Sequence, residues 1–284
     1  MTSTVLDVTL CLLLVSAGAV TLATTTPNDA STGPTTTASD RAQTLATTTA
    51  TVEFAPAGAE NGTESRSRTR NGTVVALLAD AAVGNLSVGG EPVSEGRSHF
   101  AHAVGEATRA TVGAVGVDVV ARWQPFPGSS VGGVAAVGQS PPSDADVHAA
   151  TVTVPSGLPS ARYGAQRVAG REGFAGVARV VAHRVVTGLF PAGVTAAVLD
   201  SNAGTDSRRA ASLRERHRRT AALADVRVVE SANGIDVRRT NARLVTAFAT
   251  RFERELRREY ETPEAAAAAV EVGTVTVVVR TWSR

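Results

Sequence analysis

The sequence contains no lysine, a single cysteine and few aromatic residues. All 28 basic residues are Arg and 26 residues are acidic, which leaves a formal net charge of only +2. So small a net charge gives no global attraction to nucleic acid, and we expect no nucleic-acid partner. Because Cys11 is the single cysteine, a disulfide within the chain is excluded. Because aromatic residues are only 4% of the chain, its core must be built mainly from Ala and Val.

Residues that would mark a common catalytic or metal site are also scarce. The sequence has no H-E-x-x-H motif, and no Lys-Ser or Lys-Thr follows the glycines of residues 128–143, as a phosphate-binding loop requires. Asp144, Asp146 and His148 resemble parts of a hydrolase site, but we assign no serine nucleophile to them. We predict a non-catalytic protein with no cofactor and no metal. The alternative is a secreted or tethered hydrolase.

An apolar run at residues 5–23 predicts a transmembrane anchor over residues 1–23. As a helix these 19 residues would extend about 28 Å, close to the ~30 Å of the hydrocarbon layer. A cleaved signal peptide is the main competitor, since Ala17-Gly18-Ala19 fits a small-x-small cleavage pattern. The absence of a basic segment and the presence of Asp7 favour the uncleaved anchor. Membrane lipid is therefore an expected partner. A buried helix of a soluble protein is a third interpretation.

The peptide STVLD, residues 3–7, is followed by the apolar run and resembles the mature N-terminus of type IV pilins. In pilins an acid follows the terminal residue by four positions, and Ser3 and Asp7 would take those places. The resemblance implies that Asp7 pairs with the terminal amine of a neighbouring subunit during assembly. This N-terminus and the closing VVVRTWSR, residues 277–284, are also similar to uncharacterised haloarchaeal membrane proteins associated with pilus-like or secretion gene clusters. Pilus-like or secretion-machinery subunits are the partners implied.

Residues 24–52 are rich in Thr, Ala and Pro and predict an extended stalk. Pro27 and Pro34 would interrupt a helix continuing from the membrane, so a tethered surface domain describes the chain as well as a filament subunit does. Three N-x-Ser/Thr sequons follow, with Asn61, Asn71 and Asn85 as glycosylation candidates. Stalk and sequons favour a single-pass protein of the cell membrane with an extracytoplasmic C-terminal body.

Residues 53–284 predict an α+β head with three or four strands, expected to be antiparallel. Alternating apolar residues predict strands at 117–124, 147–154 and 273–282, and residues 51–54 form a further short strand. Apolar residues at helical spacing predict helices. These cover 73–82, 99–114, 171–187, 207–224 and 241–260. The Gly- and Pro-rich residues 128–143 predict a linker and an internal domain boundary.

Two polar clusters could carry function. His99 and His102 precede Glu106 at helical spacing and could offer metal ligands. Residues 208–219, RRAASLRERHRR, could bind an anionic lipid. A solvated helix face is the favoured interpretation of both. The sequence as a whole predicts a membrane-anchored surface protein with a structural or assembly role.

Overall fold

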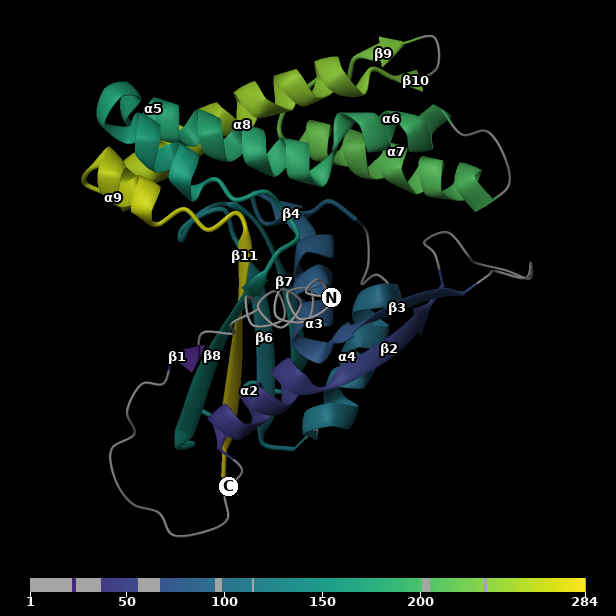
Figure 1. Ribbon diagram of the computed structural model, residues 1–284, viewed down its shortest axis with the longest axis vertical. Helices are drawn as coiled ribbons and strands as arrows, with labels where there is room; N and C mark the ends of the chain where they lie inside the picture. Colours follow the sequence, from purple (N-terminus) through teal and green to yellow (C-terminus); the bar gives the residue numbers. More distant parts are fainter. Residues whose placement is uncertain are drawn as a thin grey trace, which may run out of the picture.

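The computed structural model describes residues 22–23, 37–55, 67–94, 99–113, 115–200, 205–231 and 234–283. These residues form an antiparallel sheet with helices on one face, and a layer of helices at one end of the sheet (Figure 1). The mixed helix-and-sheet class and the antiparallel pairing expected from the sequence are therefore confirmed. The anchor predicted at residues 1–23 lies outside the described residues, apart from Leu22–Ala23. Those two residues form a short strand, β1, in place of the expected helix end.

The main sheet has seven strands in the order β1-β8-β11-β6-β7-β4-β5, more than the three or four expected. Their bounds are Leu22–Ala23 (β1), Leu86–Val88 (β4), Glu91–Pro92 (β5), Val117–Trp123 (β6), Val131–Gly138 (β7), Val147–Pro155 (β8) and Thr274–Trp282 (β11). β11 lies between β8 and β6, with Val277 opposite Val152 on one side and Ala121 on the other. The last strand of the chain thus lies in the interior of the sheet.

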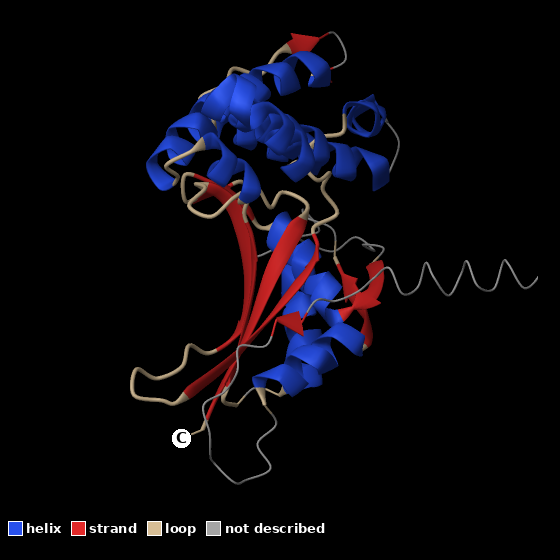
Figure 2. Cartoon of the chain, turned by 60° about the vertical axis from the view of Figure 1, so that its left-hand side comes forward, coloured by secondary structure: helices blue, strands red, loops and turns tan. Residues whose placement is uncertain are grey.

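Three helices cover one face of the sheet: α2 (Ala38–Thr47), α3 (Val74–Gly84) and α4 (His99–Val112). A separate hairpin of β2 (Thr49–Phe54) and β3 (Arg68–Thr73) lies beside them. Val275, Val277 and Val279 of β11 are fully buried on the covered face, as their alternation predicts. Within the described residues no helix covers the opposite face, where Val134 and Val147 are more than one third exposed (Figure 2).

The helical layer comprises α5 (Arg162–Leu189), α6 (Ala192–Asp200), α7 (Thr205–Leu223), α8 (Val237–Glu259) and α9 (Pro263–Ala268). A two-stranded ribbon of β9 (Glu230–Ser231) and β10 (Gly234–Ile235) precedes α8. Apolar residues recur at every fourth position of α8 and form a buried stripe: Leu244, Phe248, Phe252 and Leu256. The Phe248 and Phe252 rings stack at a centroid distance of 5.7 Å. α5 packs on α8 and α9, and its Val181 and Val185 are fully buried.

Among the described residues, one helical stretch is long and apolar enough to cross a membrane: Arg162–Leu199, which lies within the chain. Val181, Val185 and Val186 of this stretch are fully buried in the core. A central helix of a packed layer needs the same apolar composition, so this stretch is weak evidence for a membrane span.

The helical layer is an insertion between two paired strands. β8 ends at Pro155 and β11 begins at Thr274, and these two residues are register partners. The Ser156 N–H donates to the Gly273 carbonyl at 3.0 Å, which continues the ladder by one step. The Ser156 hydroxyl and the Trp123 indole N–H both donate to the Val272 carbonyl, at 2.8 and 3.0 Å. The chain therefore leaves the sheet and returns to it at one hydrogen-bonded point.

The predicted stalk is wrong where it meets the head. Residues 38–47 form α2, whose N-cap Thr37 accepts from the Asp40 N–H while the Asp40 carboxylate accepts from the Thr37 N–H, a capping box. Ala42 and Leu45 share the buried side of this helix and have no exposed surface. A Thr-rich composition hides a helix here because the few apolar residues lie at helical spacing. Residues 24–36 lie outside the described part of the chain.

The predicted boundary at residues 128–143 is also wrong, because β7 occupies its centre. Gly132 and Gly133 are required there by close backbone approach. A Cβ on Gly133 would lie 2.0 Å from the Ala82 carbonyl oxygen, and one on Gly132 would lie 2.7 Å from the Trp123 oxygen. These glycines therefore mark tight packing of α3 and β6 on the strand, a role that glycine has inside strands.

We predict that Gly133→Ala destabilises the protein, because the new methyl group would force α3 away from the sheet. Overpacking costs about 1–3 kcal/mol, and so close an approach places this variant at the upper end. Gly84→Ala is the matched control, since nothing lies within 4 Å of its Cβ position at the end of α3. Urea unfolding of the full chain measures both. Equal unfolding midpoints for the two variants would contradict the close approach.

Candidate functional site: a basic groove on helix α5

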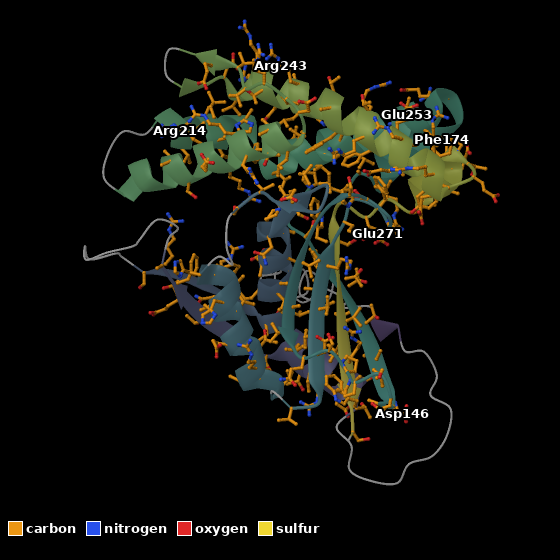
Figure 3. All side chains as sticks on the ribbon, turned by 180° about the vertical axis from the view of Figure 1, so that it is seen from behind. Asp146, Phe174, Arg214, Arg243, Glu253 and Glu271 are labelled. Carbon is orange, nitrogen blue, oxygen red and sulfur yellow. The ribbon has the colours of Figure 1, made fainter. Side chains whose placement is uncertain are left out.

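Positive charge is concentrated on the helical layer. Residues 162–261 hold 19 of the 28 Arg and only 11 of the 26 acidic residues, so this segment carries an excess of eight positive charges while the rest of the chain is net acidic. Arg214 and Arg243 lie on this layer, far from Asp146 at the opposite end of the sheet (Figure 3). The small net charge of the whole chain hides this segregation.

Helix α5 is folded back on itself at Gly173. The φ and ψ angles of this residue, 61° and −156°, interrupt the helix and are accessible essentially only to glycine. The two limbs then lie against each other: a Cβ on Gly164 in the first limb would lie 3.1 Å from a methyl group of Val180 in the second. A straight helix would separate these residues by about 24 Å. Gly173 therefore brings side chains of distant turns together.

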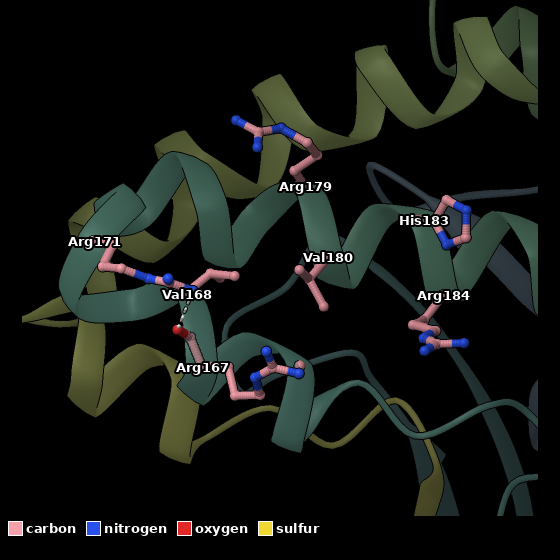
Figure 4. A pocket seen from close by; sticks show the side chains of 8 residues that line it. Arg167, Val168, Arg171, Arg179, Val180, His183 and Arg184 are labelled. Atoms are coloured by element: carbon pink, nitrogen blue, oxygen red, sulfur yellow. Dashed lines mark hydrogen bonds between the residues drawn. The ribbon is translucent and has the colours of Figure 1, made fainter.

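A cavity of about 470 Å³ lies between the limbs, and we name it the basic groove (Figure 4). Its lining residues are Gly164, Arg167, Val168, Arg171, Arg179, Val180, His183 and Arg184. The two valines form an apolar floor, while the four Arg and the His are exposed to solvent. Beside it, Tyr163 has 73% of its surface exposed.

The groove has more cations than carboxylates. Arg179 pairs with Glu172 at 2.7 Å. Arg167 lies over the Tyr163 ring at 5.9 Å, and Arg171 donates to the Arg167 carbonyl at 3.4 Å. Across the described residues, no carboxylate pairs with Arg167, Arg171 or Arg184. Guanidinium groups bind phosphate and carboxylate oxygens in forked geometry, so the arrangement suits an anionic ligand.

The Arg-rich residues 208–219 lie in α7, and the expectation of a solvated face is wrong for part of them. His217 has no exposed surface and stacks on Phe190 at a centroid distance of 4.4 Å. Its Nε2 lies 3.1 Å from Asn241 Oδ1, and Asn241 donates its own Nδ2 to the Phe190 carbonyl at 2.8 Å. The Asn241 oxygen is thus the acceptor, which assigns the proton of the neutral ring to Nε2.

Burial lowers the pKa of His217, and the hydrogen bond to Asn241 only partly offsets this effect. The unfolded chain therefore binds a proton more readily than the folded protein does. The contribution of neutral His217 to the free energy of unfolding is consequently complete above the ordinary His pKa of about 6.5. It is lost as the pH falls below that value, because the unfolded chain is protonated first.

We predict that the unfolding free energy decreases below pH 6.5, by up to ~1.4 kcal/mol per pH unit, and that His217→Gln removes this dependence. Gln retains a donor for Asn241 but does not titrate. The control is His148→Gln, an exposed residue whose replacement should leave the wild-type pH dependence intact. Urea unfolding between pH 5.5 and 7.5 measures the effect. Identical pH profiles for wild type and His217→Gln would disprove it.

Most of the sequence-predicted site residues are not brought together. Ser3, Asp7 and Asn61 lie outside the described residues. Asn71 is exposed on β3, whereas Asn85 follows α3 and donates its Nδ2 to the Val134 carbonyl at 3.0 Å. The Asn85 side-chain nitrogen, to which a glycan would be attached, is thus hydrogen-bonded within the fold. Asn71 is therefore the more accessible of these two glycosylation candidates.

The remaining predicted clusters are open and polar. His99 and His102 are exposed on α4, and Glu106 pairs with Arg109 at 2.6 Å. In the described ranges no group of three or more His, Cys, Asp or Glu is placed to hold a metal ion. His148 Nε2 lies 4.0 Å from Asp146 Oδ2, and both side chains are mostly exposed.

One polar cluster was missed in the sequence. Residues 128–132, GSSVG, have G-x-S-x-G spacing, and the Ser130 hydroxyl hydrogen-bonds to Glu255 of α8. Arg251 of the same helix also donates to Ser130 Oγ, at 3.2 Å. Ser130 leads into β7, whereas a nucleophile elbow connects a strand to a helix. The cluster therefore joins the helical layer to the sheet.

The fold and the groove together define an α+β protein with a basic helical layer inserted into an antiparallel sheet. The chain belongs to the family of unknown function DUF7284, whose model matches residues 6–282. Neither the curated proteins nor the solved structures contain a match. The family match includes the apolar N-terminal run, the sheet and the helical layer in one unit.

Proposed function

We propose that this chain is a non-catalytic, single-pass membrane protein whose helical layer contacts anionic lipid head groups. The observation that carries the proposal is the basic groove, where Arg167, Arg171 and Arg184 lack carboxylate partners within the described residues. The apolar run that precedes β1, residues 5–21, is proposed to supply the anchor, and the body is proposed to be extracytoplasmic.

Three physical features support lipid contact. A basic residue near an anionic membrane surface contributes about 1 kcal/mol of attraction, so several clustered Arg add up to stable contact. The exposed Tyr163 beside the groove is suited to the head-group region, where amphipathic aromatic rings concentrate. An anchor in the same chain would also hold the layer near the membrane and raise its effective concentration there.

We predict that anionic lipid protects residues 162–189 from hydrogen exchange. The full chain is placed in nanodiscs of phosphatidylcholine, with or without 30% phosphatidylglycerol (a composition of roughly three anionic lipids in ten, enough for a negative surface potential). Arg167→Gln/Arg171→Gln/Arg184→Gln should abolish the protection, because it removes three attractive charges.

The matched control removes three exposed charges from α8, as Arg238→Gln/Arg254→Gln/Arg258→Gln, and should retain the protection. Salt should weaken protection in the wild type by screening. Protection that is equal in neutral and anionic nanodiscs would refute lipid contact through the groove. Hydrolysis of an ester or peptide panel by the purified chain would instead favour the hydrolase alternative.

A second candidate function is assembly with partner subunits, as the STVLD resemblance implies. The open face of the sheet favours it, because the register partners Val120 and Val278 are partly exposed there and Val134 and Val147 are more than one third exposed. Exposed apolar residues gathered on one face are typical of interaction surfaces.

We predict that Asp7→Asn leaves membrane insertion intact and impairs assembly, because it removes the proposed partner of a neighbouring terminal amine. Asp146→Asn, in an exposed loop, is the matched control. Native gel electrophoresis of gently solubilised membranes measures the assembled fraction. If Asp7→Asn assembles like wild type, the pilin-like pairing is wrong.

A further inference from the structure

A second cavity lies where the helical layer meets the helices that cover the sheet. Its volume is about 330 Å³, near the lower end of the ~300–1,000 Å³ of small-molecule sites. It is lined by Phe54, Arg70, Asp80, Val83, Gly84, Phe100 and Arg216. Arg216 comes from α7 and all the others from the β2–β3 hairpin, α3 and α4. We name it the junction cavity.

The Arg216 side chain is partly buried against this cavity, and no carboxylate of the described residues pairs with its guanidinium. Its Nη2 donates to the Val83 carbonyl at the long distance of 3.5 Å, and its Nε is buried with no hydrogen-bond partner among the described residues. Burial accordingly lowers the pKa of Arg216. A guanidinium offers five donors, and leaving a buried donor unsatisfied is costly. An acceptor with negative charge would satisfy it.

The other walls define what such a ligand looks like. Arg70 and Asp80 bind each other at 2.6 Å, so their charges cancel and the cavity keeps one positive charge. Phe54 and Phe100 meet edge to face at a centroid distance of 5.0 Å and form an apolar wall. One cation and two aromatic rings in the same cavity fit a single negative charge joined to an apolar body.

We propose that the junction cavity binds a small organic monoanion, with its carboxylate on Arg216 and its apolar body against Phe54 and Phe100. The Arg70–Asp80 pair contributes no net charge, and the Asp80 carboxylate disfavours a doubly charged ligand. The site contains residues of both parts of the molecule, so a bound ligand also ties α7 to the helices on the sheet. It is separate from the basic groove, with which it shares no residue.

The test is equilibrium dialysis of the full chain in phosphatidylcholine nanodiscs, with empty nanodiscs as the blank. The probes are 3-phenylpropionate, the neutral 3-phenylpropanol, the cationic 3-phenylpropylammonium and inorganic phosphate. We expect phenylpropionate to bind at least about tenfold more tightly than the alcohol, as a charge-assisted hydrogen bond allows. The ammonium and phosphate should not bind at this site. The series needs no variant, so it decides the matter even if substitutions unfold the protein.

Variants then locate the site. Arg216→Gln should weaken phenylpropionate binding by at least about tenfold, the loss expected for one charged hydrogen-bond donor. Arg218→Gln removes an exposed charge two residues away and should bind like wild type. The proposal would be overturned if the acid and the alcohol bound equally well, or if Arg216→Gln bound phenylpropionate as tightly as wild type does. Phosphate that competes as well as the acid would also overturn it. Loss of binding in Arg184→Gln would do so too, by placing the probe in the basic groove.

Discussion

The Val272 carbonyl is the point on which the two parts of the molecule depend. It accepts hydrogen bonds from the Trp123 indole in β6 and from the Ser156 hydroxyl at the end of β8. Residues 156–273 lie between two neighbouring strands, and closing so long a loop costs entropy that local contacts must offset. The buried donors of Trp123 and Ser156 have this carbonyl as their acceptor, so the insertion begins and ends at a defined position. The helical layer is thereby held in place at the end of the sheet.

This constraint also explains where the two candidate sites lie. The basic groove belongs wholly to the layer and needs only the reversal at Gly173, whereas the junction cavity needs the layer to be held against α3. Both sites contain arginines that pair with no carboxylate of the described residues, although the rest of the chain is net acidic. Concentrating cations in one layer raises their mutual repulsion, and an anionic ligand or surface relieves it. The segregation of charge and the anion-binding proposals therefore have one physical origin.

Sequence patterns predicted the regular elements well where burial is one-sided. The alternation in β6 and β11 and the four-residue stripe in α8 each identify one buried face, because backbone geometry fixes the repeat. The patterns failed at residues 38–47 and 131–138. In the first, three apolar residues, Ala38, Ala42 and Leu45, are buried only because α2 packs on the sheet. In the second, glycine allows close backbone contact with Ala82. From composition alone, the same glycines predict a linker. The candidate metal and hydrolase clusters likewise could not be judged from spacing.

By itself the sequence determined which residues alternate or repeat, and hence the strands, the stripe of α8 and the apolar run at its start. Only the tertiary structure decided which of the many arginines line a cavity and lack a carboxylate partner among the described residues. Arg167 and Arg184 share a groove because Gly173 reverses the helix between them. Arg216 lines the junction cavity because α7 lies against the end of α3. The physical reason is that periodicity is a property of the local backbone. The environment of a charge depends on what the rest of the chain places around it.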